Sequence, residues 1–293
     1  MVVKFIAHAG IAIEDAGCML LVDPWFRDST LEEPIIEGIN GKKSIEFQIP
    51  PTKEHIEDYS PMAILISHFH THHSPLKDIT TLIENTYHDI TLAHPDGYAN
   101  DITKEKLGKF RHLVLRPTND KEFFTVGPFT ITAFSHTVIN HLAWSIKSNT
   151  GHVLHLADGQ ANKNLAINAL DPLWDYFSDL SLDLVFMSAG RNSLLVEKDG
   201  QRSIVEAGCF SPVQAARLIQ KIKPKAISPI GNHNHSYKKN RLEFIPETSA
   251  NEEELRWAMS WLAPETKFVP VRPSHSFSIG ETFRSDSFSD TYL

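Results

Sequence analysis

Four histidines lie within six positions of the segment "ILISHFHTHHSPL", which covers residues 64 to 76. They are His68, His70, His72 and His73. Imidazole is the commonest metal-binding side chain in proteins. A cluster this dense is costly to bury without a metal, because its ring nitrogens need partners and protonated rings repel one another. The spacing therefore predicts a metal site, against the alternatives of surface histidines or a hydrogen-bonded core cluster.

The order of these histidines also indicates how they would be arranged. Alternate side chains of an extended segment point to the same side, so His68 and His70 are expected to face one point. His73 is offset from them and can turn toward a second point. The cluster directly follows an apolar stretch that reads as a strand, and α/β folds commonly place functional groups at such strand ends.

Three later segments have the chemistry to complete such a site. His136 ends the predicted strand "ITAFSH", and Asp158 lies in "HLADGQ" after an apolar stretch. His233 and His235 lie in "SPIGNHNHS", again just after a predicted strand. Each of these positions is a junction between a strand and a loop, so the fold could gather them on one rim of a sheet.

The bulk composition limits the partners of such a site. The chain has 293 residues and a formal net charge of -8, which disfavours nucleic acid or an anionic membrane as the main partner. A small-molecule substrate is expected, and a homo-oligomer stays open. Cys18 and Cys209 are far apart and form no Cys-x-x-Cys pair, which makes a thiolate zinc site unfavourable. With no secretory signal or membrane-length apolar run, we expect a cytoplasmic protein.

The elements that must position these residues follow a repeated pattern. Predicted hairpins come first and strand–helix units follow, once from residue 2 to about 100 and again from about 110 onward. This pattern predicts an α/β (α+β) fold, a four-layer αββα sandwich with two mixed β-sheets flanked by helices, in a single domain over residues 1–293. Residues 27–60 are polar and rich in proline and glycine, so we expect an inserted loop that acts as a lid. Ser74 and Ser211 are expected to cap helices.

These residues resemble a known family, the metallo-β-lactamase fold superfamily. Its main motif is His-x-His-x-Asp-His after a strand, and this chain has His68-Phe69-His70-Thr71-His72-His73. The segments "HAGIAIEDAGCMLLVDPWF" and "CFSPVQAARLIQKIKPKAISPIGNHNH" resemble the branch that includes L-ascorbate-6-phosphate lactonase. The resemblance extends over nearly the whole chain, and it implies the same αββα sandwich.

The resemblance also implies a centre of one or two divalent metal ions. Zinc is the expected metal, and manganese and iron are the alternatives. The implied ligands are His68, His70 and His136 for the first metal and His72, His73 and His233 for the second, with Asp158 bridging the two. Asp158 and His233 are in addition the implied catalytic residues.

Two departures from the family pattern matter for this centre. His72 stands where the motif has aspartate, and a neutral ligand removes one negative charge from the second site, which would weaken its hold on a cation. The alternative is that His72 points away and the centre is single. The closing histidine usually follows the proline by two residues, whereas Pro229 is followed by His233 and His235 at longer spacings. We prefer His233, with His235 as the alternative.

The implied activity is that of a metal-dependent hydrolase in which a metal-bound hydroxide attacks an ester, lactone or phosphodiester. The alternatives are an iron-dependent redox enzyme on the same fold and a degenerate member that only binds a metal or ligand. Asp23, which ends a buried strand, is expected to accept a hydrogen bond from a ligand histidine or a nearby backbone group. His141, His152 and His155 are expected to lie on sheet faces.

Overall fold

The structure is a computed structural model, and most of the chain is described in it. The described residues are 1–7, 9–26, 30–34, 44–48, 54–68, 74–96, 105–135, 141–157, 171–189, 192–198, 201–207, 210–230, 242–244, 248–270 and 276–279. Of the predicted metal ligands, His68 is among them.

The first large sheet has seven strands in the order β19-β1-β2-β3-β6-β7-β8. Its strands are β1 (Val2–Ala7), β2 (Gly10–Asp15), β3 (Cys18–Val22), β6 (Ala63–Leu65), β7 (Ile90–Pro95), β8 (Leu113–Thr118) and β19 (Ser276–Ser278). Strands β1 to β3 form an antiparallel meander, and β3, β6, β7 and β8 are parallel. The parallel strands therefore all end at the same edge of this sheet.

The second large sheet also has seven strands, in the order β18-β16-β13-β12-β11-β10-β9. Its strands are β9 (Phe123–Val126), β10 (Phe129–Ser135), β11 (Leu142–Lys147), β12 (His152–His155), β13 (Leu184–Ser188), β16 (Ala226–Ile230) and β18 (Lys267–Phe268). Strands β9 to β12 are antiparallel neighbours, whereas β12, β13 and β16 are parallel. Strands β9 and β10 form one hairpin and β11 and β12 another, with turns after Val126 and after Lys147.

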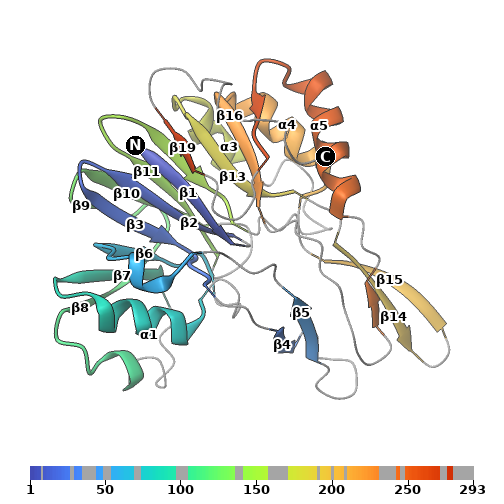
Figure 1. Ribbon diagram of the computed structural model, residues 1–293. Coiled ribbons are helices and arrows are strands. Elements are labelled where there is room, and N and C mark those ends of the chain that lie inside the picture. Colours follow the sequence, from blue (N-terminus) through green and yellow to red (C-terminus); the bar gives the residue numbers. More distant parts are fainter. Residues whose placement is uncertain are drawn as a thin grey trace.

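Helices cover the outer faces of both sheets (Figure 1). Helix α1 (Leu76–Asn85) packs on the first sheet through Ile79, Leu82 and Ile83. Helices α3 (Asp171–Ser178), α4 (Pro212–Ile222) and α5 (Thr248–Leu262) pack on the second sheet through apolar residues such as Phe177, Ile219 and Leu255. The layers are thus helix, sheet, sheet and helix, and the predicted αββα sandwich is confirmed.

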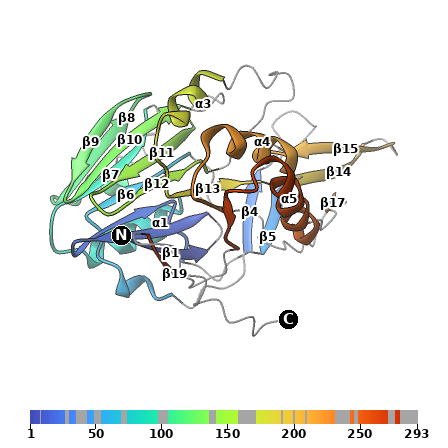
Figure 2. The same ribbon diagram turned by 90° about the horizontal axis from the view of Figure 1, so that it is seen from above.

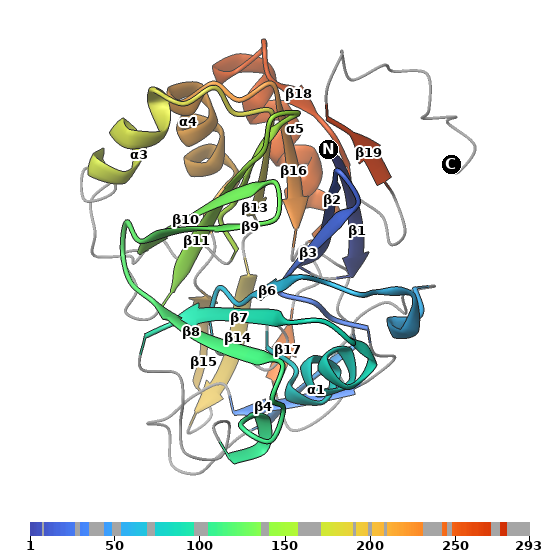
Figure 3. The same cartoon turned by 90° about the vertical axis from the view of Figure 1, so that its left-hand side faces the viewer.

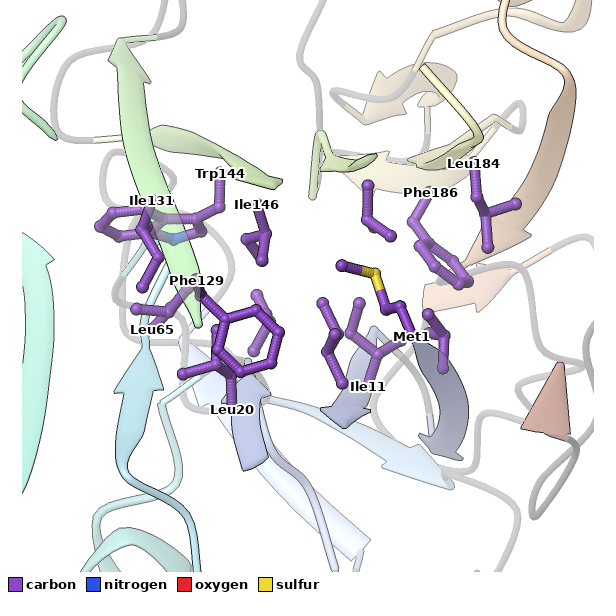
Figure 4. Packing of buried hydrophobic residues seen from close by; sticks show 14 of the residues in the cluster. Met1, Ile11, Leu20, Leu65, Phe129, Ile131, Trp144, Ile146, Leu184 and Phe186 are labelled. Atoms are coloured by element: carbon purple, nitrogen blue, oxygen red, sulfur yellow. The ribbon is translucent and has the colours of Figure 1, made fainter. Parts of the chain in front are cut away.

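The inner faces of the two sheets share one apolar core. Alternate residues of β2, Ile11 and Ile13, point into it from the first sheet, while Ile131 and Trp144 reach it from the second. Figure 4 shows Ile11, Ile131 and Trp144 among the side chains that pack between the sheets. Strands such as β6 and β13 are buried along their whole length, and their sequences are nearly continuous apolar runs.

Two smaller sheets lie outside the sandwich. One pairs β4 (Thr30–Pro34) with β5 (Ser44–Gln48), and the other joins β14 (Asn192–Lys198), β15 (Gln201–Ala207) and β17 (Leu242–Phe244). Figures 1 and 3 both show them on the lower side of the molecule, toward which β16 runs, and Figure 2 shows β14 and β15 projecting from the body. In the described part of residues 27–60, the predicted insertion, β4 and β5 pair in register and a 3-10 helix, η1 (Ile56–Asp58), follows.

Helix caps agree with the sequence at one of the two predicted positions. Ser211 caps α4 through a complete capping box with Gln214, as predicted. Ser74 was wrong by one residue, because Pro75 is the N-cap of α1 and makes no side-chain cap hydrogen bond. Proline fixes its own φ near a value that suits the start of a helix. Among the described residues, no helix is long and apolar enough to span a membrane.

Candidate metal centre

The edges at which the parallel strands of the two sheets end are tied together by two hydrogen bonds. The backbone N–H of Leu142, at the start of β11, donates to the carbonyl oxygen of Ser67 over 2.8 Å. The Nε2 atom of His155, at the end of β12, lies 2.9 Å from the carbonyl oxygen of Ala9 and donates to it, because a carbonyl can only accept. The strand ends of both sheets therefore form one rim.

His68 lies on this rim, directly after β6, and only 1% of it is exposed. Its Nδ1 atom is 2.9 Å from the hydroxyl oxygen of Ser67. That hydroxyl donates its one proton to Oδ2 of Asp23 over 2.5 Å, and the Ser67 backbone N–H donates to Oδ1 of Asp23 over 2.7 Å. The Ser67 oxygen is thus left with lone pairs only, so the Nδ1 atom of His68 must carry the proton. The lone pair of His68 is consequently on Nε2, the nitrogen that would bind a metal in this tautomer.

Asp23 was expected to accept a hydrogen bond from a ligand histidine or from a nearby backbone group. The second alternative is confirmed, because Asp23 accepts a hydrogen bond from the backbone N–H of Ser67. It orients His68 through the hydroxyl of Ser67. Such a carboxylate behind a histidine ligand fixes the tautomer and the orientation of the ring. Asp23 is fully buried and has a φ of 45°, a backbone conformation that non-glycine residues rarely adopt. Strain of this kind persists only where the surrounding structure enforces it.

Gly10 is part of what holds Asp23 in place. A Cβ atom on Gly10 would lie 2.9 Å from the carbonyl oxygen of Asp23 and 3.1 Å from the backbone nitrogen of Trp25. Only glycine allows the turn between β1 and β2 to approach the end of β3 this closely. The rim is therefore packed from both sides of Asp23, by Gly10 on one and by Ser67 on the other.

His141 is the residue whose predicted place was wrong. It was expected on a sheet face, but it lies one residue before β11 and stacks on His68, with ring centroids 4.1 Å apart and ring planes 13° apart. His152 and His155 do lie within strand β12, as expected. Sequence reasoning also missed Ser67, although a serine directly before the first motif histidine is a usable signal for a hydrogen bond to its ring.

The other predicted ligands lie outside the described residues. They are His70, His72, His73, His136, Asp158, His233 and the alternative His235. Ser135, which precedes His136, and Ile230, which precedes the segment of His233, both lie on the rim. Ser135 pairs with Leu142, and Ile230 pairs with Ser188. Ala157, just before Asp158, has a φ of 49° and accepts a hydrogen bond from the backbone of Ser188. The segments that carry the predicted ligands thus all leave from one edge of the sandwich.

The fit of a divalent metal can be judged at one predicted ligand, His68, in the described part of the chain. Within it, no three His, Cys, Asp or Glu side chains are grouped closely enough to hold an ion. The tautomer of His68 suits a metal ligand, because its proton is on Nδ1 and its lone pair is on Nε2. A neutral imidazole with its second nitrogen hydrogen-bonded is the usual form of a histidine ligand for zinc and iron.

The fold places the chain among known structures. It is similar to Igni18, a metallo hydrolase from the archaeon Ignicoccus hospitalis, with a TM-score of 0.61, 14% identity and coverage of 96% of this chain and 100% of Igni18. It is also similar to YhfI, a metallo-β-lactamase fold protein from Bacillus subtilis, with a TM-score of 0.58, 17% identity and coverage of 94% and 98%. The two sheets and their flanking helices therefore have the metallo-β-lactamase fold.

A third similar structure is a diiron enzyme. CmlA, a diiron β-hydroxylase from Streptomyces venezuelae, matches with a TM-score of 0.63 and 13% identity over 94% of this chain. This chain spans about half of CmlA, with 54% covered. No protein-family model matches the chain, and no curated protein matches it in sequence. The structural neighbours thus include a metallo hydrolase and a diiron β-hydroxylase.

Proposed function

We propose that this chain is a metal-dependent hydrolase that cleaves an ester, lactone or phosphodiester bond in a small molecule. The observation that carries the proposal is the hydrogen-bonded chain from Asp23 through Ser67 to His68. This hydrogen-bonded chain orients a buried imidazole whose lone pair is on Nε2. The imidazole lies on the rim of the sandwich, and the segments that carry the other predicted ligands begin at the same rim.

The proposed ligands of the centre are His68, His70 and His136 for one ion, and His73 and His233 for a second, with Asp158 between them. Zinc is the proposed metal, and His72 decides whether the second ion is held. When bound, such an ion lowers the pKa of water toward about 7 and polarises the bond to be cleaved. The chain's own part is to hold His68 rigidly and to keep its Nδ1 proton on the side of Ser67.

The substrate proposed for this centre is small and not a nucleic acid. The net charge of -8 disfavours polyanions as partners. The β4–β5 hairpin lies on the lower side of the molecule in Figure 1, the side toward which β16 runs, and we propose that it shapes access to the substrate. The lactonase branch is the proposed subgroup, because the segments that begin at His8 and Cys209 resemble those of that branch.

The test combines metal analysis with hydrolysis assays on the purified chain. We expect zinc to copurify and a panel of generic esters, lactones and phosphodiesters to include a substrate. His68→Ala should lose both metal and activity, whereas His112→Ala, which removes a half-buried histidine next to Phe110 and away from the rim, should keep both. Unchanged metal content and hydrolysis in His68→Ala would sink the proposal.

The second candidate is an iron-dependent redox enzyme, and the structural similarity to CmlA favours it. Histidine and carboxylate ligands suit iron as well as zinc. Metal analysis of protein purified without added metal separates the two candidates. Iron without zinc, together with no hydrolysis of the panel, would favour the redox enzyme.

A further inference from the structure

The ring of His68 is restrained in two independent ways. The hydrogen bond between Nδ1 and Ser67 restrains the ring within its own plane, because it fixes the direction of one ring atom. The ring of His141 covers one face of His68, with centroids 4.1 Å apart and planes nearly parallel at 13°. A single hydrogen bond to one edge still allows the ring to tilt about that bond, and a flat neighbour on its face opposes this tilt.

His141 is itself held by the backbone of both sheets. Leu142, the next residue, donates its N–H to the carbonyl oxygen of Ser67, the residue before His68. Leu142 also pairs with Ser135 in the β10–β11 ladder. The two histidines are therefore each one residue away from the same hydrogen bond between the sheets, and any shift of one sheet relative to the other would separate their rings.

We propose that His141 is a positioning residue for His68, and that it acts through the flat face of its ring and not by donating a nitrogen to the metal. The inference rests on the proposed metal centre. A ligand that is already held in its binding orientation loses less conformational freedom when the ion binds. Ligands of a functional site are positioned best when packing as well as hydrogen bonding fixes their rotamers. The stack supplies the packing part of that support.

Two substitutions of similar volume separate stacking from ligation. His141→Phe keeps a flat ring but has no nitrogen, and His141→Leu has neither. Zinc affinity is measured for each by competition with a chromophoric chelator, and thermal unfolding checks that each variant is folded. An aromatic stack suggests that His141→Leu binds zinc roughly three- to tenfold more weakly, with His141→Phe within about twofold of the wild type. His112→Leu serves as the matched control and should leave the affinity unchanged.

Two results would overturn the proposal, one by showing that His141 is a ligand and the other by showing that its ring has no effect on His68. If His141→Phe binds zinc as weakly as His141→Leu, the nitrogen is needed and His141 is a ligand. If His141→Leu binds zinc as tightly as the wild type, the stack does not position His68.

A measurement on the metal-free protein keeps this inference distinct from the proposed function. With ring ¹⁵N-labelled histidine, the NMR signals of His68 should report the Nδ1–H tautomer in the wild type and in His141→Phe. In His141→Leu they should shift or broaden, because the ring is released. If the wild type binds no zinc but these signals change as expected, the proposed function fails while the stack stands. Signals of His68 that do not respond to His141→Leu would overturn the inference itself.

Discussion

The backbone N–H of Leu142 donates to the carbonyl oxygen of Ser67 over 2.8 Å, and this hydrogen bond joins the two sheets of the sandwich. Ser67 is also the residue through which Asp23 orients His68. Ser67 therefore links the two sheets and also fixes the tautomer of His68, the first predicted ligand. Changes at this rim are expected to alter stability and metal binding together.

Ser67→Ala should weaken zinc binding by roughly ten- to hundredfold, the usual effect of losing a partner behind a metal ligand. The substitution removes the acceptor of the Nδ1 proton of His68, so the ring loses its fixed tautomer. Chelator competition measures the affinity. Ser228→Ala is the control, because Ser228 is equally buried and donates to Val269 within the second sheet. Equal affinities of the two variants would contradict the role assigned to Ser67.

Gly10→Ala should destabilise the fold by about 1–3 kcal/mol, the usual cost of overpacking a tight contact. The added Cβ meets the backbone of Asp23 and Trp25 at 2.9 and 3.1 Å, and backbone cannot move aside cheaply. Urea denaturation measures the free energy of unfolding, and zinc affinity should fall in parallel as Asp23 shifts. Gly17→Asn is the control: Gly17 has a φ of 77° with open space around it, and asparagine tolerates such a φ.

Ala157→Gly should leave the free energy of unfolding unchanged or raise it by up to about 1 kcal/mol. Ala157 has a φ of 49°, which costs an L-residue about 1–2 kcal/mol, and glycine removes this cost while adding freedom to the unfolded chain. Ala157→Val should destabilise the fold clearly, because a β-branched side chain fits this backbone poorly. In ordinary strand conformation, Ala143→Gly should cost about 0.5–1 kcal/mol. A loss in Ala157→Gly as large as that in Ala143→Gly would argue against strain at Ala157.

His152 should make the fold less stable as the pH falls. Burial lowers the pKa of His152 below its usual value near 6.5, with Lys147 acting in the same direction and Asp183 opposing. The unfolded chain therefore binds more protons than the folded one between the lowered pKa and about 6.5, so stability is complete above that window and declines as the pH falls through it. The neutral ring is held in place by Ser145, whose hydroxyl lies 2.7 Å from Nε2.

Urea denaturation at a series of pH values tests this dependence. His152→Gln should be less stable than the wild type at neutral pH, but its stability should fall less steeply below pH 6.5. His112→Gln should keep the steep dependence of the wild type. A profile of His152→Gln parallel to that of the wild type would show that another group carries the effect.

The sequence alone determined the layers of the fold. Apolar runs such as that in "MLLVDP" and the helix pattern of "SPVQAARLIQKIKP" are local properties, so strands, helices and their order could be predicted with the two sheets. The β4–β5 hairpin was missed because polar, proline-containing residues carry no clear alternation, and its pairing is decided by a partner strand and not by local preference.

For the candidate site as well, the sequence predicted one part and the tertiary structure alone decided the other. The density of histidines after β6 was enough to predict a metal site, because side-chain type and spacing are written in the chain. The stack of His141 on His68 and the hydrogen-bonded chain from Asp23 through Ser67 were not predictable from the sequence. The two stacked histidines are separated by 73 positions along the chain, and Asp23 is separated from Ser67 by 44 positions. Such contacts exist only because two separately formed sheets meet at one rim, and the hydrogen bond between Leu142 and Ser67 fixes where they meet.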